Sequence, residues 1–451
     1  MEKNLTTGSI MKTLIVFSLP FLLSTFLQTL YGLADLFIIG QFCPTEATTA
    51  VSIGSQVMHM LTVMIVGLAM GSTVLIGKAV GAADSELRNR AVGNTVTLFL
   101  IVAVCATAIL LIAVSGIVSV MSTPEEAVNG TRQYLMICFA GVPFITAYNI
   151  ISSIFRGMGD SKSPMYFVAV ACVFNIALDF IFIGAVGLGP AGAALGTTIS
   201  QAISVIIALT VIVKKKMISG IGLNDFKPVR DIIGKITSVG IPVAAQDGFI
   251  QISFIVITIF ANRRGLVDSA AVGVVEKLIG ILFLVPSTLL ASVSALCAQN
   301  IGAGRHDRAK STMKDAMLIV VIFGTAMSVI FQFAAPFAVS LFSKDAAVIT
   351  AGAGYMRSYV VDCIFAGIHF IFSGYFCAYS KSGLSFLHNL ISVLAARIPL
   401  SYVASVYFKD TLFPMGMAAP IGSCLSIVIC VIAYRWLLKN VVPKEDTVTN
   451  F

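Results

Sequence analysis

The sequence has few charged residues. Asp, Glu, Lys and Arg make up 11% of its 451 residues, whereas soluble domains usually carry about 25%. Only one Trp is present, and the nine Cys form neither a CxxC pair nor a Cys/His cluster, which argues against a zinc site and a disulfide framework. Apolar residues account for 58% of the chain. A soluble fold of this size would need more polar surface, so we expect lipid to surround most of the chain.

The common catalytic and nucleotide-binding motifs are absent too. The sequence has no HExxH, GxSxG or P-loop pattern, so neither a hydrolase nor an ATPase is indicated. Gly187, Gly189 and Gly192 match GxGxxG, but no soluble strand and helix flank them, and we interpret the match as a turn. The net charge of +8 does not indicate nucleic acid, because the basic residues lie in short loops between apolar runs. We expect no enzyme activity and no bound cofactor.

What is present is a series of long apolar runs. A membrane-spanning helix needs roughly 20 apolar residues. The first run, residues 14–40, is too long for a signal peptide and lacks a small-residue cleavage site, so it is interpreted as a membrane span. We predict an all-α membrane protein with twelve transmembrane helices at 14–39, 51–77, 92–119, 132–155, 164–185, 191–213, 236–260, 270–297, 313–338, 355–379, 385–407 and 415–438.

The loop charges predict the orientation of these spans. Most of the 29 Lys and Arg fall at the N-terminus, in the even-numbered loops, in the segment 214–235 and in the C-terminal tail. Cytoplasmic loops of membrane proteins carry an excess of Lys and Arg. We therefore expect a multi-pass protein of a prokaryotic plasma membrane with both termini in the cytoplasm.

The two halves of the sequence repeat one plan. At a shift of 221 or 222 residues, five landmarks of the first half coincide with landmarks of the second: Leu19-Pro20 with Ile241-Pro242, Gly81-Ala82 with Gly302-Ala303, Ser122 with Ser343, Tyr134 with Tyr355, and Phe155 with Phe376. Because each half has an even number of spans, the repeats are parallel and related by a pseudo-two-fold axis along the membrane normal. We predict an N-terminal six-helix lobe (1–213), a basic cytoplasmic linker (214–235) and a C-terminal six-helix lobe (236–451). A cavity between two such lobes could open alternately to either side; a duplication without a functional cleft is the alternative.

Four oxygen-bearing side chains share one depth in the first lobe. Asp35, Asn175, Asp179 and Thr197 all lie in the outer halves of their predicted spans. An ionisable residue inside a span costs on the order of 2.5–3.5 kcal/mol on insertion scales and is a functional hypothesis by default. One Asp could hold a proton, or the four groups could bind a cation such as Na⁺ through their oxygen atoms. The alternative is that hydroxyl and backbone groups merely satisfy each Asp.

The second lobe does not keep these acids. It has a polar set of its own, which with two residues of the first span gives the candidate substrate cavity: Gln28, Tyr31, Asp247, Gln251, Glu276, Asp362, His369 and Arg397. Asp362 and His369 are seven residues apart and should share a helix face. Structural ion pairing is as good an interpretation of the charged members as ligand contact.

Proline and glycine positions complete the pattern. Pro20 and Pro242 interrupt the first and seventh spans, where the missing N–H loosens the helix. Pro20 is a candidate hinge, and a static kink is the alternative. Gly192 and Gly196 have the GxxxG spacing that allows helices to approach closely, and we interpret them as packing residues.

Several further stretches are distinctive: FSLPFLLSTF (17–26), YGLADLFIIG (31–40), IGKAVGA (76–82), FRGMGDSKSP (155–164), NIALD (175–179) and GAALGTTIS (192–200), with weaker counterparts VGIP (239–242) and AQNIGAG (298–304). Together they resemble the multidrug and toxic compound extrusion (MATE) family over almost the whole chain. NIALD and GAALGT are most similar to the subgroup related to bacterial DNA-damage-inducible and staphylococcal multidrug exporters.

The resemblance implies a V-shaped two-lobe fold and secondary active export of organic cations in exchange for H⁺ or Na⁺. It also implies that Asp35, Asn175, Asp179 and Thr197 form the cation-responsive site and that Pro20 bends the first helix. Some relatives place essential acids in the seventh and tenth helices, where Asp247 and Asp362 lie here. We expect the partners to be small cationic substrates and the lipid bilayer, with no nucleic acid. We expect the protein to be a monomer. A lipid-linked saccharide flippase of the same superfamily is the alternative, but a flippase should have a more basic cavity than these spans provide.

Overall fold

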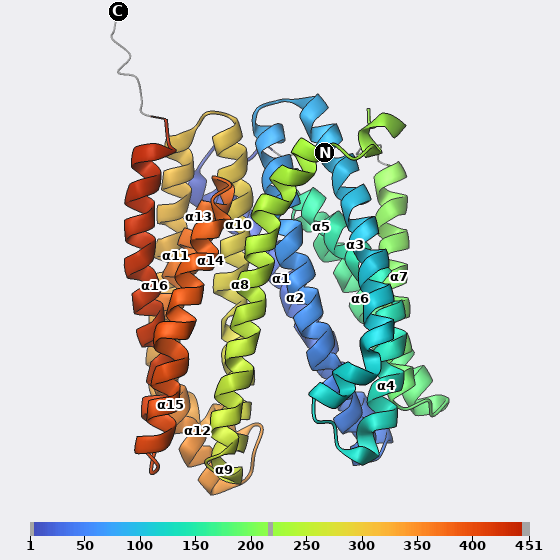
Figure 1. Ribbon diagram of the computed structural model, residues 1–451, viewed down its shortest axis with the longest axis vertical. Helices are drawn as coiled ribbons and strands as arrows, with labels where there is room; N and C mark the ends of the chain where they lie inside the picture. Colours follow the sequence, from blue (N-terminus) through green and yellow to red (C-terminus); the bar gives the residue numbers. More distant parts are fainter. Residues whose placement is uncertain (1–3, 215–219, 444–451) are drawn as a thin grey trace, which may run out of the picture. The chain divides into compact units, whose positions relative to one another are not determined.

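The computed structural model describes residues 4–214 and 220–443, and helices make up most of these residues (Figure 1). Lys3, Lys215, Lys216 and Lys444, which contribute to the predicted orientation, lie outside the described residues. The elements in chain order are α1 (Ile10–Phe42), α2 (Thr45–Gly81), α3 (Ser85–Val120), α4 (Glu125–Ala140), α5 (Val142–Gly157), α6 (Lys162–Asp179), η1 (Phe180–Ala185), α7 (Pro190–Lys214), η2 (Leu223–Phe226), α8 (Arg230–Asn262), α9 (Leu266–Leu282), α10 (Leu284–Gly302), α11 (His306–Ser340), α12 (Ala346–Tyr359), α13 (Asp362–Ala378), α14 (Ser382–Ser392), η3 (Val393–Arg397), α15 (Ile398–Tyr407) and α16 (Phe413–Asn440).

The helices account for all of the predicted spans. Among the described residues, ten helical segments are long and apolar enough to cross a bilayer, and the number is twelve when each of two bent pairs is one span. The bent pairs are α4 with α5, at 49°, and α12 with α13, at 41°. Each predicted run falls inside one of these segments to within a residue. The prediction of an all-α membrane protein is thus confirmed.

Short turns of the same kind recur in both halves of the chain. The turn after α2 places Ala83 at φ 56°, and the turn after α10 places Gly304 at φ 71°. Likewise Gly159 after α5 has φ 85°, and Ser380 after α13 has φ 57°. Each pair is separated by the repeat distance seen in the sequence. The repeat therefore extends to left-handed backbone positions, which non-glycine residues adopt rarely.

The chain forms two compact units. The first contains Ile15–Ala244, and the second contains Thr6–Leu14 together with the residues from Ala245 onward. The boundaries fall inside α1 and α8, so the first turn of α1 and the second half of α8 belong to the second unit. That residues 214–235 act as a linker stays a prediction, and 215–219 of it lie outside the described residues.

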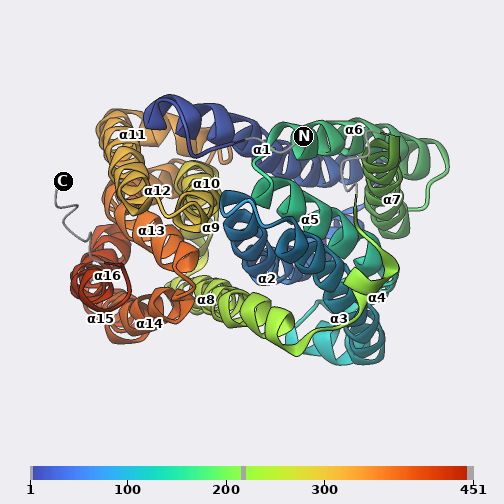
Figure 2. The ribbon, with the colours of Figure 1, turned by 90° about the horizontal axis from the view of Figure 1, so that it is seen from above.

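Corresponding helices pack in the same way within each unit. In the first unit α5 packs against α2 and α3, and α4 packs against α7. In the second unit α13 packs against α10 and α11, and α12 packs against α16 (Figure 2). Since lipid removes most of the hydrophobic drive between helices, this packing depends on van der Waals contact and on interhelical hydrogen bonds.

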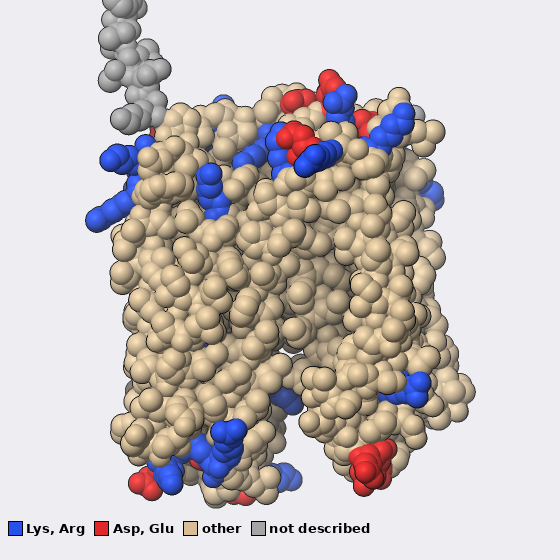
Figure 3. Space-filling view, in the orientation of Figure 1, with Lys and Arg blue, Asp and Glu red and all other residues tan. Residues whose placement is uncertain are grey.

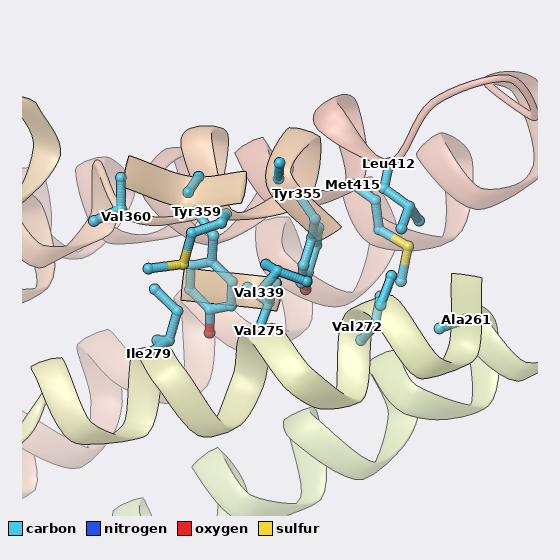
Figure 4. Close-up of a cluster of buried hydrophobic side chains, with 14 of the residues drawn as sticks. Ala261, Val272, Val275, Ile279, Val339, Tyr355, Tyr359, Val360, Leu412 and Met415 are labelled. Carbon is cyan, nitrogen blue, oxygen red and sulfur yellow. The ribbon is translucent and has the colours of Figure 1, made fainter. Parts of the chain in front are cut away.

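Large aromatic side chains fill the middle of the second unit. Tyr355 and Tyr359 of α12 are almost completely buried, and they pack with Val275 and Ile279 of α9 (Figure 4). Apolar clusters of described residues also lie in the first unit, and one of them contains Phe99 and Phe155. On the face shown in Figure 3, the charged side chains gather at the two ends, and the band between them is uncharged, as a bilayer requires.

Candidate functional site

The first unit contains a buried carboxyl site, formed by Asp35, Asn175, Asp179 and Thr197. Asp35 comes from α1, Asn175 and Asp179 from α6, and Thr197 from α7. Asp35 is 4% exposed and Asp179 is fully buried. The four side chains that the sequence placed at one depth are therefore neighbours in space.

Hydrogen bonds connect the members of this site. The Thr197 hydroxyl donates to Asp35 Oδ2 at 3.1 Å, and Asn175 Nδ2 lies 3.5 Å from the same hydroxyl oxygen. The carboxyl of Asp179 and the amide of Asn175 also lie within hydrogen-bonding reach of Asp35. Two carboxylates have no proton to donate, so a hydrogen bond between the two Asp requires that one of them is protonated.

Several oxygen atoms of the site remain open. Within the part of the chain that the structure describes, no donor reaches Asp35 Oδ1, Asn175 Oδ1 or either oxygen of Asp179 through an ordinary hydrogen bond. No basic side chain of the described residues interacts with either Asp. Buried polar groups are normally paired, so an ion or a proton is needed to complete this arrangement.

Local backbone features place the Asp179 carboxyl. α6 ends at Asp179 and continues as the π-helix η1, in which the Val186 N–H donates to Ile181 O at 2.9 Å. π-helical segments are rare and frequently occur at functional sites. A Cβ at Gly196 of α7 would overlap Asp179 Oδ1. The packing interpretation of this glycine is therefore right, and its packing partner is a carboxyl group.

Polar residues of α1 extend toward the rest of the first unit. Gln201 Nε2 of α7 donates to the Tyr31 hydroxyl at 3.2 Å. Gln28, one turn earlier on α1, is within hydrogen-bonding reach of the Tyr148 hydroxyl on α5. Both candidate cavity residues are thus connected to neighbouring helices of the first unit.

The second unit contains a charged group that we call the Arg397 cluster, defined as Phe254, Glu276, Tyr359, Asp362 and Arg397. Arg397 Nη2 donates to the Tyr359 hydroxyl, and its guanidinium lies 4.5 Å from the centre of the Phe254 ring. Glu276 and Asp362 interact with it electrostatically. Arg397 is the last residue of the π-helix η3, in the span that corresponds to α6 and η1 of the first unit.

Two histidines with neighbouring rings, each beside serine hydroxyls, lie next to this cluster. His369 Nε2 lies 3.5 Å from the Ser423 hydroxyl, which is also within reach of Asp362. The expectation that Asp362 and His369 share a face is consistent with this common partner. The ring of His388 is 5.3 Å from that of His369, and its Nε2 lies 2.9 Å from the Ser373 hydroxyl.

Not every predicted residue joins a cluster. Asp247 and Gln251 are half-buried on α8, and among the described residues neither side chain forms a hydrogen bond with the Arg397 cluster. Lys277 is exposed and so is not a member of that cluster. The predicted span 132–155 leaves Arg156 in a cytoplasmic loop, but the residue is buried in α5, with its guanidinium 4.7 Å from the centre of the Phe21 ring.

Sequence reasoning missed Phe254, Tyr359 and His388. Aromatic residues are common in apolar spans, so nothing in the local pattern marks the two that hold Arg397. Tyr359 does end the helix before the bend that precedes Asp362. A tyrosine three residues before an intramembrane acid is the one signal that could have indicated it.

Known proteins share both the sequence pattern and the fold. The "Probable multidrug resistance protein YoeA" of Bacillus subtilis is 26% identical over 442 residues, covering 96% of this chain and 95% of that protein. The "Multidrug export protein MepA" of Staphylococcus saprophyticus is 25% identical over 368 residues, covering 81% of each chain. A solved crystal structure of a MATE in complex with MaL6 superposes with a TM-score of 0.90 at 23% identity, covering 96% of this chain and 98% of that one.

The MatE family model matches the chain twice, at residues 20–181 and 242–403. The two matches are equally long, and the second begins 222 residues after the first, which confirms the internal repeat. Their positions also agree with the two copies of the backbone turns. This double match covers more than half of the chain, and with the twelve spans and the shared fold it shows that the protein is a multi-pass membrane transporter of the MatE family.

Proposed function

We propose that this transporter is a secondary active exporter of cationic organic compounds, driven by exchange for H⁺ or Na⁺ through alternating access. The observation that carries the proposal is the buried pair Asp35 and Asp179, whose carboxyl groups lie within hydrogen-bonding reach of each other, with no basic side chain of the described residues beside them. The names of two relatives, a probable multidrug resistance protein and a multidrug export protein, support export of drug-like compounds.

The geometry of the carboxyl site supports ion coupling in two ways. Two ionised carboxylates at this distance repel each other strongly away from water, so the pair requires a shared proton or a small cation. A proton would occupy the contact between the two Asp. A sodium ion would take the open oxygen atoms of Asp179 and Asn175 as hard ligands.

Occupancy of this site can change the shape of the unit, because its residues come from three helices. With the ion bound, α1 is held to α6 and α7 through Asp35; without it, like charges push α1 away. A ligand shifts a conformational equilibrium by the difference in its affinity for the two states. An ion bound in one state and released in the other therefore supplies the driving force for export.

The flippase alternative requires a basic cavity for a pyrophosphate group. The only bases predicted within the spans were Lys277, which is exposed, and Arg397, which has two acids nearby. The buried Arg156 of α5 adds one, and it lies over an aromatic ring. The charges of the described residues favour a cationic cargo.

Purified protein in lipid vesicles tests the proposal. An imposed proton or sodium gradient should drive movement of a fluorescent organic cation, and Asp35→Asn or Asp179→Asn should abolish the response to the gradient. Asp231→Asn is a matched control, because Asp231 is exposed and, in the described part of the chain, pairs with Lys235 one helix turn away. Gradient-driven transport that survives both site substitutions would refute the assignment of the carboxyl site.

A further inference from the structure

We infer that Arg397 is a built-in counter-ion that determines the charge of the preferred substrate, so that the second unit selects organic cations with one positive charge over those with two. The inference rests on the proposed export of organic cations and assigns a specificity role to a residue of the second unit.

Arg397 is fixed by aromatic groups and not by an acid. Its Nη2 donates to the Tyr359 hydroxyl, and its guanidinium lies over the Phe254 ring. Tyr359 is 1% exposed and packs in the apolar core of the unit. Among the described residues, no ion pair joins Arg397 to Glu276 or Asp362, although both acids are within its electrostatic range.

The cluster therefore keeps open positions of both signs. Glu276 Oε1, Asp362 Oδ1 and Arg397 Nε are buried atoms without a hydrogen-bond partner in the described part of the chain. Asp362 itself is 3% exposed. A buried polar atom without a partner is costly, and three of them on residues that interact electrostatically indicate a guest that brings its own charge or dipole.

The charge of the guest follows from the charges of the cluster. With both carboxyls ionised, Glu276, Asp362 and Arg397 together carry one negative charge, which one monovalent cation neutralises. A second positive charge on the guest would lie beside the guanidinium without a counter-ion. The carboxyl site of the first unit differs in this respect, because no described basic residue accompanies its two acids. This difference separates an ion site from a cargo site.

Substitution of Arg397 tests this directly. Consider a unit charge that lies within about 7 Å of the guest. At an effective dielectric constant of about 20, its removal should change the affinity for a dication relative to a monocation by about tenfold or more. We expect Arg397→Gln to shift the ratio of methyl viologen to tetraphenylphosphonium transport toward the dication by at least about tenfold. Arg397→Lys should keep the ratio within about threefold of the parent protein, because it keeps the charge.

Two further variants separate charge from damage to the fold. Lys277→Gln is the matched control, because Lys277 follows Glu276 in the sequence but lies on the exposed face of α9. Removing its positive charge should leave the transport ratio unchanged. The double variant Arg397→Gln with Glu276→Gln restores a single negative charge, so it should return the preference to the monocation.

The outcomes are distinguishable. If the parent protein moves neither cation under any gradient, the proposed function itself fails. If transport persists and Arg397→Gln leaves the ratio unchanged, the inference about Arg397 is wrong. Should Arg397→Gln not fold, Glu276→Gln alone decides the question, because the neutral cluster should bind tetraphenylphosphonium at least about tenfold more weakly; equal affinity would overturn the inference.

Discussion

The Thr197 hydroxyl donates a 3.1 Å hydrogen bond to Asp35 Oδ2, which joins α7 to α1 over 162 positions of sequence. The same hydroxyl oxygen lies 3.5 Å from the amide nitrogen of Asn175 on α6. One small side chain therefore connects the three helices of the carboxyl site.

Thr197→Val keeps the shape of the side chain and removes its hydroxyl. Loss of a hydrogen bond to a charged group costs about 1.5–3 kcal/mol. We therefore expect the apparent affinity for the driving ion to fall roughly tenfold or more. Transport rates measured against ion concentration in vesicles check this. Thr198→Val is the control, since the Thr198 hydroxyl has no partner among the described residues. Equal effects of the two substitutions would contradict the role given to Thr197.

Gly196→Ala should disable the carboxyl site by a steric effect. The added Cβ would overlap Asp179 Oδ1, so either the carboxyl or α7 has to move. We expect loss of gradient-driven transport and a lower melting temperature. Gly116→Ala is the matched control, because that position in α3 has nothing within 4 Å of a new Cβ, and alanine favours a helix by up to about 1 kcal/mol. If Gly196→Ala behaves like Gly116→Ala in both assays, the close packing at Asp179 is not functional.

Much of this architecture could be predicted from the sequence, because lipid imposes a simple rule on it. Every backbone polar group in the bilayer has to be satisfied locally, so long apolar runs such as 92–119 become helices whatever their partners are. The depth of Asp35 and Asp179 followed from counting residues along those helices. At a common depth, the two Asp can meet once α1, α6 and α7 are neighbouring helices.

The Arg397 cluster was less predictable, because side-chain direction decides its membership. Glu276 and Lys277 are adjacent in sequence, and both are ionisable, yet only Glu276 turns inward. The π-helix η3 changes the helical phase just before Arg397, and simple periodicity does not reveal such a change. The same limit explains why Arg156 was expected in a loop and is buried.

The N-terminal segment should depend on two arginines of the second unit. Arg305 Nη1 donates to Thr6 O at 2.7 Å, and Arg308 Nη1 donates to Gly8 O at 2.9 Å. We expect Arg305→Ala with Arg308→Ala to increase hydrogen exchange in a peptide that covers residues 4–14, because the carbonyls lose charge-assisted partners and the segment opens locally. Arg435→Ala, at an exposed position of α16, is the control. Unchanged exchange in the double variant would show that packing alone holds the segment.

Pro20→Ala tests the hinge. Proline at this position of α1 lacks the N–H that would bond to the carbonyl of Val16, so the helix bends more easily there than elsewhere. Alanine restores that hydrogen bond and stiffens α1. If bending of α1 moves Asp35 relative to α6 and α7, Pro20→Ala should reduce transport several-fold or more while the melting temperature stays the same or rises. Pro242→Ala changes the equivalent position of α8, which contributes no residue to the carboxyl site, and so provides the comparison.

If Pro20 is only a static kink, the opposite result is expected. Its removal would then disturb packing and lower the melting temperature, and transport would fall only in proportion to the loss of stability. Measuring both quantities for both variants therefore separates a hinge from a kink, and a stable Pro20→Ala protein with normal transport would eliminate the hinge.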